Sequence, residues 1–279
     1  MAALRFHTLD VFTDRPFSGN PLAVFPQCGD LPDATMQRLA RELNLSETVF
    51  VGPPTGPMRF PVRIFTPARE LPFAGHPTVG TALLLDALGF LDGSPDTSRE
   101  VVLEQGVGPV PVSIQTHDGR RMARFRTARL PETSPSRLGR AEAAVLLGLD
   151  PAQVVADPVV ASCGVPFQMI ELDGISALGK AALDPALWRR NLAEDPVRDI
   201  YCFTRRGART DVRARMFAPS MDIAEDPATG AAAAALAGYL ASLLRDDGTH
   251  ALDIEQGIEM GRPSLIRTEV ARRGGQIDA

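Results

Sequence analysis

The chain has 279 residues, 44% hydrophobic and 23% charged, which is ordinary for a globular protein and long enough for one large domain or two lobes with separate cores. The net charge is −5, and the 29 basic residues are scattered among 34 acidic ones, which argues against nucleic acid as a partner. The N-terminus has no apolar core of signal-peptide length, and no stretch approaches the roughly 20 apolar residues that a membrane span needs. We therefore predict a cytoplasmic protein that does not bind membranes.

In chain order, residues 1–25 and 49–65 are predicted to be rich in strands, and residues 32–43 carry a helical period. Residues 101–125 are predicted as hairpin strands that are broken at 117–119. Further helices are predicted over residues 78–91, 141–147, 186–192 and 228–244, the last of them Ala-rich and buried.

Two segments of the chain repeat each other. RIFTPARELPFAGHPTVGTALL (63–84) aligns with RMFAPSMDIAEDPATGAAAAALAG (215–238) when a two-residue gap is allowed. The alignment pairs Arg63 with Arg215, Phe65 with Phe217, Pro67 with Pro219, His76 with Asp226, Pro77 with Pro227 and Gly80 with Gly230. SGNPLAVF (18–25) also resembles CGVPFQMI (163–170). Two copies of this size indicate a duplication into two similar lobes rather than a solenoid.

The predicted fold class is therefore α+β. We expect two similar lobes, each a curled and mostly antiparallel sheet around a central helix, related by pseudo-two-fold symmetry. The predicted lobes are residues 1–128 and 129–279, with the boundary within residues 127–135.

The repeated helices are predicted to begin at equivalent places. Pro77 and Pro227 suit a first helical turn, and Asp226 is a preferred N-cap residue. A helix N-terminus binds carboxylates and developing oxyanions, so two such termini aimed at one cleft would form a pocket for a small acid. His76 and Asp226 would then carry or orient a proton, although a plain N-cap remains an alternative for Asp226.

Glu47 lies between the first helix and an apolar strand. It could simply face solvent at the end of the helix. A carboxylate that enters an apolar strand could instead be half buried with a raised pKa, which a proton shuttle needs near neutral pH. These residues alone leave both interpretations open.

Cys28, Cys163 and Cys202 form no C-x-x-C pair and are predicted to be reduced thiols. With only four histidines and no His/Cys cluster, no metal site is predicted. Neither G-x-G-x-x-G nor G-x-x-x-x-G-K-[ST] occurs, so no cofactor is predicted.

Four segments together resemble the signature segments of the PhzF (phenazine biosynthesis) family, and the resemblance extends over residues 4 to about 262. The segments are FTDRPFSGNPLAVF (12–25), NLSETVFV (44–51), ELPFAGHPTVGTA (70–82) and EDPATGAA (225–232). The resemblance implies a diaminopimelate-epimerase-like fold with the active site in a cleft between two lobes, and a homodimer.

The resemblance also implies an activity and a set of site residues. Glu47 would be the acid/base residue of a cofactor-independent isomerase that moves a proton between carbons of trans-2,3-dihydro-3-hydroxyanthranilate or a similar small carboxylic acid. His76 and Asp226 would orient the substrate or assist proton movement, and Ser46, Gly75, Gly230 and Ala231 would line the pocket.

One position departs from the family pattern. Many members carry Ser after the glycine of D-P-x-T-G, where this chain has Ala231. The backbone N–H remains, but a hydroxyl that could bind the substrate is lost, so the substrate is expected to differ.

Two alternatives stay open. An amino-acid racemase or epimerase on the same fold would use two cysteines at the helix N-termini, where this chain has His76 and Asp226. A non-catalytic member would bind a small molecule, and Ala231 gives that alternative some support.

Overall fold

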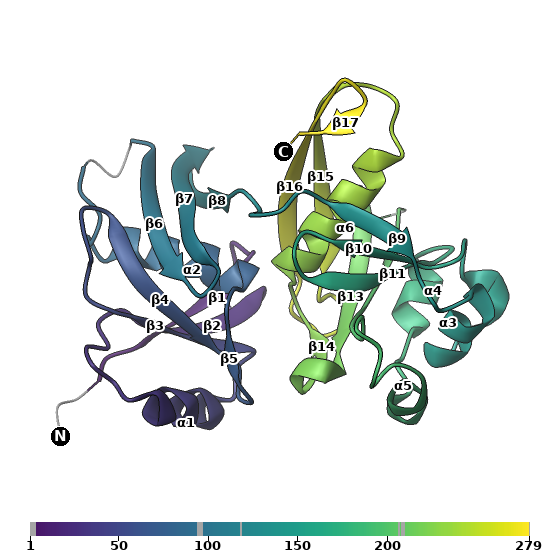
Figure 1. Ribbon diagram of the computed structural model, residues 1–279, viewed down its shortest axis with the longest axis horizontal. Coiled ribbons are helices and arrows are strands. Elements are labelled where there is room, and N and C mark those ends of the chain that lie inside the picture. Colours follow the sequence, from purple (N-terminus) through teal and green to yellow (C-terminus); the bar gives the residue numbers. More distant parts are fainter. Residues whose placement is uncertain (1–3, 94–96, 118, 206, 208–209, 279) are drawn as a thin grey trace. The chain divides into compact units, whose positions relative to one another are not determined.

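The computed structural model describes residues 4–93, 97–117, 119–205, 207 and 210–278. The chain divides into two compact units, an N-terminal unit of residues 1–126 and a C-terminal unit of residues 127–279 (Figure 1). Within the described ranges, none of the helices is both long enough and apolar enough to cross a bilayer.

In its described residues, the N-terminal unit forms one eight-stranded sheet with two helices. Its strands are β1 (His7–Val11), β2 (Asn20–Phe25), β3 (Glu47–Val51), β4 (Arg59–Phe65), β5 (Glu70–Leu71), β6 (Arg99–Gln105), β7 (Gly108–His117) and β8 (Arg120–Phe125). Its helices are α1 (Asp33–Leu43) and α2 (Gly75–Ala87).

The described part of the C-terminal unit forms a nine-stranded sheet. Its strands are β9 (Glu132–Pro135), β10 (Val159–Ser162), β11 (Pro166–Glu171), β12 (Ile200–Thr204), β13 (Val212–Ala218), β14 (Ile223–Asp226), β15 (Gly248–Gln256), β16 (Ser264–Arg273) and β17 (Gln276–Ile277). Its helices are α3 (Arg140–Leu146), α4 (Ile175–Lys180), α5 (Pro185–Asn191) and α6 (Gly230–Ser242), with short 3-10 turns η1 (Pro151–Gln153) and η2 (Pro219–Met221).

The two sheets have the same strand order, as the repeat predicted. The order β1-β2-β3-β4-β6-β7-β8, with β5 beside β4, matches β10-β11-β12-β13-β15-β16-β17, with β14 beside β13. In each sheet the second strand is parallel to the third, the fourth is parallel to the strand after the central helix, and the other matched neighbours are antiparallel. β9 extends the C-terminal sheet beyond this shared pattern.

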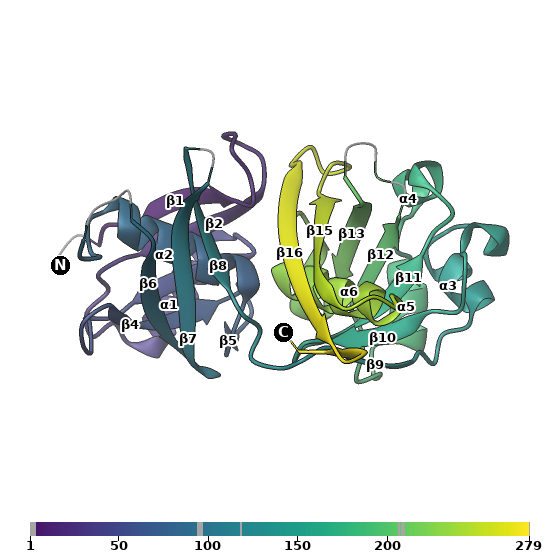
Figure 2. The same ribbon diagram turned by 90° about the horizontal axis from the view of Figure 1, so that it is seen from above.

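Each sheet curls around one central helix, as predicted. α2 contacts both β1 and β8, at opposite edges of its sheet, and α6 likewise contacts both β9 and β17. Figure 2 shows α6 within the curve of its strands. Both helices begin at a glycine and span 13 residues, and α6 is rich in alanine, so strands can approach it from several sides.

The outer face of each sheet carries the remaining helices. In the N-terminal unit α1 packs on Phe25, Phe50 and Phe65, and the helical period predicted over 32–43 is confirmed as α1. In the C-terminal unit Ile170, Cys202 and Phe217 pack in a cluster with residues of α3 and α4. The helices predicted over 141–147 and 186–192 are confirmed as α3 and α5, each shifted by one residue, whereas α4 was not predicted.

The hairpin predicted over 101–125 is confirmed as β7 and β8, whereas the preceding turn between β6 and β7 was not predicted. Of the predicted break at 117–119, Asp118 lies outside the described residues.

Candidate functional site

Glu47 is buried, and the prediction that it could face solvent is wrong. It is the first residue of β3, where it lies opposite Leu22 of the parallel neighbour β2, and only 8% of its surface is exposed. The following residues of β3 are all buried. Its carboxylate therefore stands at the edge of an apolar core rather than on the surface.

His76 is the second residue of α2 and is also buried. Its Nε2 lies 3.3 Å from Oε2 of Glu47, a close contact without the alignment of a hydrogen bond. Burial lowers the pKa of His76 to about 3, so the ring is neutral at ordinary pH and the contact is not an ion pair. A neutral imidazole can accept a hydrogen bond at Nε2 when the neighbouring carboxyl group is protonated, so Glu47 can hold a proton here without two buried charges being formed.

Ser46 and Gly75 flank this pair. Ser46 directly precedes β3, and Gly75 is the first residue of α2. The N-cap residue Ala74 provides no side-chain hydrogen bond, so the first-turn N–H groups of α2 receive no cap from that residue. The structure thus brings Glu47 to His76 at the start of α2, with Ser46 and Gly75 next to them in the chain.

Asp226 is not the N-cap of α6, contrary to the prediction. It is the last residue of β14, where it pairs with Met216, and α6 begins at Gly230 with Thr229 as its N-cap. The hydroxyl of Thr229 donates to Asp226 Oδ2 at 2.5 Å. Because β14 continues through Asp226, the helix cannot begin there, and Pro227 lies outside the helical turn while Pro77 lies within it.

The predicted equivalence of the two helix starts is therefore only partly correct. In the alignment that pairs Gly80 with Gly230, α2 begins five residues earlier than α6. Gly230 and Ala231 are the first two residues of α6 and are partly buried, near Asp226 in the chain but outside the strand that holds it.

Gln256, at the end of β15, fixes the segment between Asp226 and α6. Its Nε2 donates to Asp226 O at 2.7 Å and to Thr229 Oγ1 at 3.1 Å, while its Oε1 accepts from Thr229 N at 3.2 Å and from Tyr201 Oη at 3.0 Å. A β-carbon on the next residue, Gly257, would lie 2.6 Å from Pro227 O, so glycine is needed for this close approach.

Gln105, at the end of β6, is the counterpart of Gln256 in the N-terminal unit. Its Nε2 donates to Thr78 Oγ1 at 2.9 Å, and that hydroxyl donates in turn to Ala74 O at 2.7 Å. The sequence contained a signal that we missed, because E-Q-G occurs at both 104–106 and 255–257. Each glutamine supports the start of its central helix.

A repeated arginine supports the strand that leads toward each helix. Arg63 binds Glu70 with two hydrogen bonds and Arg215 binds Glu225 in the same way. Each guanidinium also lies over the ring of the repeated phenylalanine, Phe65 at 5.1 Å or Phe217 at 5.0 Å. The aligned arginines and phenylalanines are thus structurally equivalent.

The weaker repeat is also confirmed. Gly19 and Gly164 both have positive φ, 67° and 118°, and β2 and β11 begin just after them. A β-carbon at Gly19 would lie 2.2 Å from Val11 O, so no other residue fits there.

The three cysteines are free thiols, and burial raises the pKa of each. The pKa of Cys163 is raised to about 11 and that of Cys202 to about 12. The thiols of Cys28 and Cys202 donate to backbone carbonyls within their own units. Thiols held in the protonated form are poor bases, which argues against a thiol racemase.

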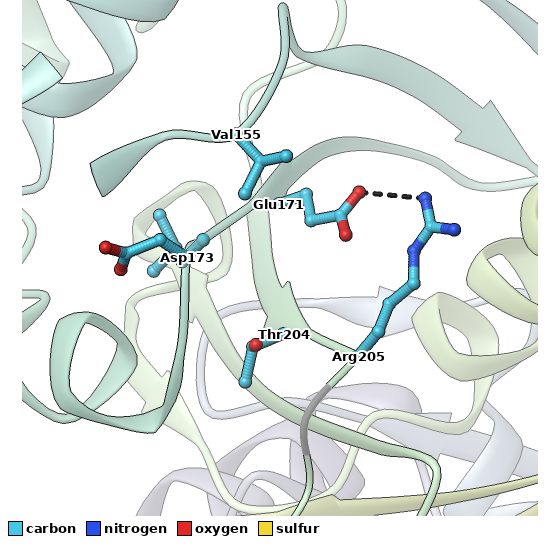
Figure 3. A pocket seen from close by; sticks show the side chains of 6 residues that line it. Val155, Glu171, Asp173, Thr204 and Arg205 are labelled. Carbon is cyan, nitrogen blue, oxygen red and sulfur yellow. Dashed lines mark hydrogen bonds and ion pairs between the residues drawn. The ribbon is translucent and has the colours of Figure 1, made fainter. Parts of the chain in front are cut away.

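A hollow of about 330 Å³ in the C-terminal unit is lined by Val155, Glu171, Leu172, Asp173, Thr204 and Arg205. Figure 3 shows Glu171 and Arg205 facing each other across it, joined by an ion pair of 2.9 Å. Glu171 is the last residue of β11, and Arg205 directly follows β12. Asp199 directly precedes β12, at the opposite end of that strand. None of the predicted site residues lines this hollow.

Comparison with known sequences gives consistent matches over almost the whole chain. A family model described as phenazine biosynthesis-like protein matches residues 9–278. An uncharacterised isomerase of Mesorhizobium japonicum is 41% identical, covering 96% of this chain and 91% of that protein. Trans-2,3-dihydro-3-hydroxyanthranilate isomerase of Pseudomonas aeruginosa is 36% identical, covering 99% of this chain and 93% of that protein.

Solved structures show the same fold. A predicted epimerase from Pseudomonas aeruginosa is 30% identical with a TM-score of 0.79, covering 96% of this chain and 92% of that one. A PhzF-family protein of Bacillus anthracis has a TM-score of 0.89 at 24% identity, covering 98% of this chain and 92% of that one. At this identity the likeness supports the fold alone.

Proposed function

The chain belongs to the phenazine biosynthesis-like (PhzF) family of isomerases, and we propose that it moves a proton between two carbons of a small cyclic carboxylic acid, with Glu47 as the acid/base residue. The observation that carries this proposal is the 3.3 Å approach of buried Glu47 to buried, neutral His76. A general base and a neutral imidazole in one apolar setting suit proton transfer at carbon.

In the proposed reaction, the Glu47 carboxylate removes a proton from an activated carbon and becomes a carboxylic acid. The electron pair from the broken C–H bond moves into the adjacent unsaturated system, and Glu47 returns one proton to another carbon of that system. In D₂O the Glu47 proton can exchange with solvent first, so that deuterium enters the product. No atom is gained or lost, so the product is an isomer. His76 stabilises the protonated form of Glu47 through Nε2, and the first-turn N–H groups of α2 suit the carboxylate of the substrate.

Asp226 is proposed to act on the same substrate, either as a second proton carrier or by orienting it. Its burial and its 2.5 Å hydrogen bond from Thr229 hold the carboxylate in one orientation. We also propose that the protein works in the cytoplasm, as its composition indicated, without a cofactor, and as a homodimer, as the sequence resemblance implied.

The proposed reaction can be tested by NMR. The native protein is incubated with trans-2,3-dihydro-3-hydroxyanthranilate in D₂O, and substrate loss and deuterium uptake are followed. We expect turnover by the native protein and a fall in kcat of about 10³-fold in Glu47→Gln, an effect within the range of general acid/base catalysis. Glu42→Gln, an exposed change on α1 in the same unit, is the matched control and should behave like the native protein.

Either part of the proposal can fail separately. Equal turnover by the native protein and Glu47→Gln would reject the acid/base role. If the native protein binds this acid without turning it over, this substrate is rejected. In that case Ala231→Ser should restore turnover if the missing hydroxyl is the cause. Neither binding nor turnover would reject the substrate class.

A racemase-like reaction is the second candidate, because a structure at 30% identity is described as a predicted epimerase. The three protonated thiols weigh against a thiol-based version of it. Exchange of the α-proton of a free amino acid in D₂O would favour this candidate.

A further inference from the structure

Glu47 has a counterpart in the C-terminal unit that the proposed reaction does not use. The pairing of the third and fourth strands has the same register in both units, with Thr48 opposite Phe65 and Ile200 opposite Phe217. One residue earlier stand Glu47 and Asp199, both of them carboxylates and both buried, at 8% and 9% exposure. The sequence repeat did not include this pair.

The two carboxylates also lie on the same side of their strands. Side chains alternate along a strand, so Glu47 shares the face of Val49, which packs in the core around α2. Asp199 shares the face of Tyr201, whose hydroxyl binds Gln256 near the start of α6. Asp199 therefore belongs to the face that carries the central helix, as Glu47 does.

The two carboxylates have different neighbours. Glu47 approaches His76, whereas Asp199 Oδ2 accepts a hydrogen bond of 2.8 Å from Ser220 Oγ. Ser220 lies in η2, the turn that joins β13 to β14. In the N-terminal unit the equivalent turn is held from outside, because Gln37 of α1 donates to Thr66 O and Pro67 O.

β14 needs such support because it is short. It has four residues, and its pairing with β13 is irregular between Met216 and Ala218. Gln256 fixes its far end through Asp226 O, and the hydrogen bond between Ser220 and Asp199 fixes the turn where it begins. Asp199 itself lies next to β12, which is paired on both sides by β11 and β13.

We propose that Asp199 is a positioning residue, which holds η2 through Ser220 and thereby sets the place of β14 and of the Asp226 carboxylate. This inference rests on the proposed function for the role of Asp226 but not for the structural link. The same register position thus serves proton transfer in one unit and alignment of a second carboxylate in the other.

The structural link is tested first, without substrate, by hydrogen exchange of the amides of residues 223–226. Ser220→Ala and Asp199→Ala should speed this exchange about tenfold or more, while exchange in β3 and β4 of the N-terminal unit stays unchanged as an internal control of folding. Ser220→Thr, which keeps the hydroxyl, and Asp199→Asn, which keeps an acceptor, should stay within about threefold of the native rate. Unchanged exchange in Ser220→Ala would overturn the inference.

The effect on catalysis is then measured on the variants that fold. Ser220→Ala and Asp199→Ala should lower kcat about tenfold, with KM and the shape of the pH profile little changed, and Asp199→Asn should retain most of kcat. Loss of turnover in Asp199→Asn as complete as in Glu47→Gln would overturn the positioning role, since it would make Asp199 an acid/base residue. Native kcat in Ser220→Ala despite faster exchange would overturn the link to Asp226. If the native protein turns over no acid, the proposed function fails while the exchange result still decides the structural link.

Discussion

The N-terminal and C-terminal units share a strand order, an arginine over a phenylalanine, and a glutamine that supports the central helix, yet they differ where that helix begins. α2 starts at Gly75 and carries His76 in its first turn, whereas β14 runs on to Asp226 and α6 starts only at Gly230. The two aligned residues therefore lie in different elements. The buried imidazole of His76 belongs to the first turn of a helix, and the buried carboxylate of Asp226 belongs to the end of a strand. Duplicated scaffolds can acquire different chemistry in this way without a change of topology.

The support around the two helix starts differs as well. Gln256 makes four hydrogen bonds to its surroundings, but Gln105 donates one, and among the described residues its Oε1 has no hydrogen-bond partner. Arg215 is more deeply buried than Arg63 and also donates to two backbone carbonyls. We expect the C-terminal unit to depend more strongly on its repeated polar residues.

The repeated arginines give the largest expected difference. Arg215→Met should lower the free energy of unfolding by about 3 kcal/mol, because it leaves Glu225 and two carbonyls without their buried partner. Arg63→Met should cost about 1 kcal/mol or less, since its ion pairs with Asp33 and Glu70 are more exposed. Urea unfolding of both variants measures the difference, and equal losses would contradict the unequal dependence of the two units.

The repeated glutamines come next. Gln256→Leu should cost about 2–3 kcal/mol, because Asp226 O, Thr229 N and the Tyr201 hydroxyl each lose a buried partner. Gln105→Leu, the matched change in the other unit, should cost about 1 kcal/mol, because one hydrogen bond is lost. Chemical unfolding of the two variants under identical conditions tests this, and a larger loss for Gln105→Leu would reverse the comparison.

His76 should make stability depend on pH. Its pKa is about 3 in the folded protein and near 6.5 in the unfolded chain, so the unfolded chain binds the proton first as the pH falls. The stability contributed by neutral His76 is fully present above pH 6.5 and is lost as the pH falls toward 3, by about 2 kcal/mol between pH 7 and pH 5.

The measurement compares the native protein with His76→Gln, which cannot titrate at this position. The free energies of unfolding of the two proteins should converge as the pH falls from 7 to 5, since only the native protein loses the histidine contribution. A difference that stays constant over this range would show that His76 is readily protonated in the folded state.

The smallest expected effect concerns a residue that is specific to one unit. Tyr201→Phe removes the hydroxyl that donates to Gln256, while Val49 stands at the matching register position of β3 and has no such group. We expect the free energy of unfolding to fall by only about 1 kcal/mol, because Gln256 Oε1 keeps its hydrogen bond from Thr229 N. Tyr239→Phe, at the partly buried second tyrosine, is the control and should cost less, as thermal unfolding of both variants would show.

The sequence predicted the duplicated fold because the repeated residues have local roles. Arg63 and Arg215 bind the carboxylate of the adjoining short strand, and Gly19 and Gly164 permit a backbone turn that other residues resist, so both features leave a direct mark on the sequence. The helices α1, α3 and α5 were likewise predicted from their periodicity and lie within one residue of the expected ranges.

The details of the candidate site depend on contacts between distant segments. The burial of Glu47 follows from the pairing of β3 with β2, and the late start of α6 follows from the pairing of β14 with β13 and from Gln256, thirty residues beyond Asp226. Aspartate is a preferred N-cap residue, so local preference alone placed the start of α6 too early, at Asp226. The match between Glu47 and Asp199 appears only in strand register, because their flanking residues differ.

The burial of α2 and α6 on several sides has a consequence for how the chain folds. Each of these helices connects two strands that lie side by side in parallel, β4 with β6 and β13 with β15, so the second strand can join the sheet only after the chain has crossed over through the helix. Such non-local pairing is slow because the entropy of closing a long loop is lost before the pairing stabilises the chain. We expect newly made chains to be most exposed to aggregation during this delay, while the apolar helix α6 lacks its covering strands.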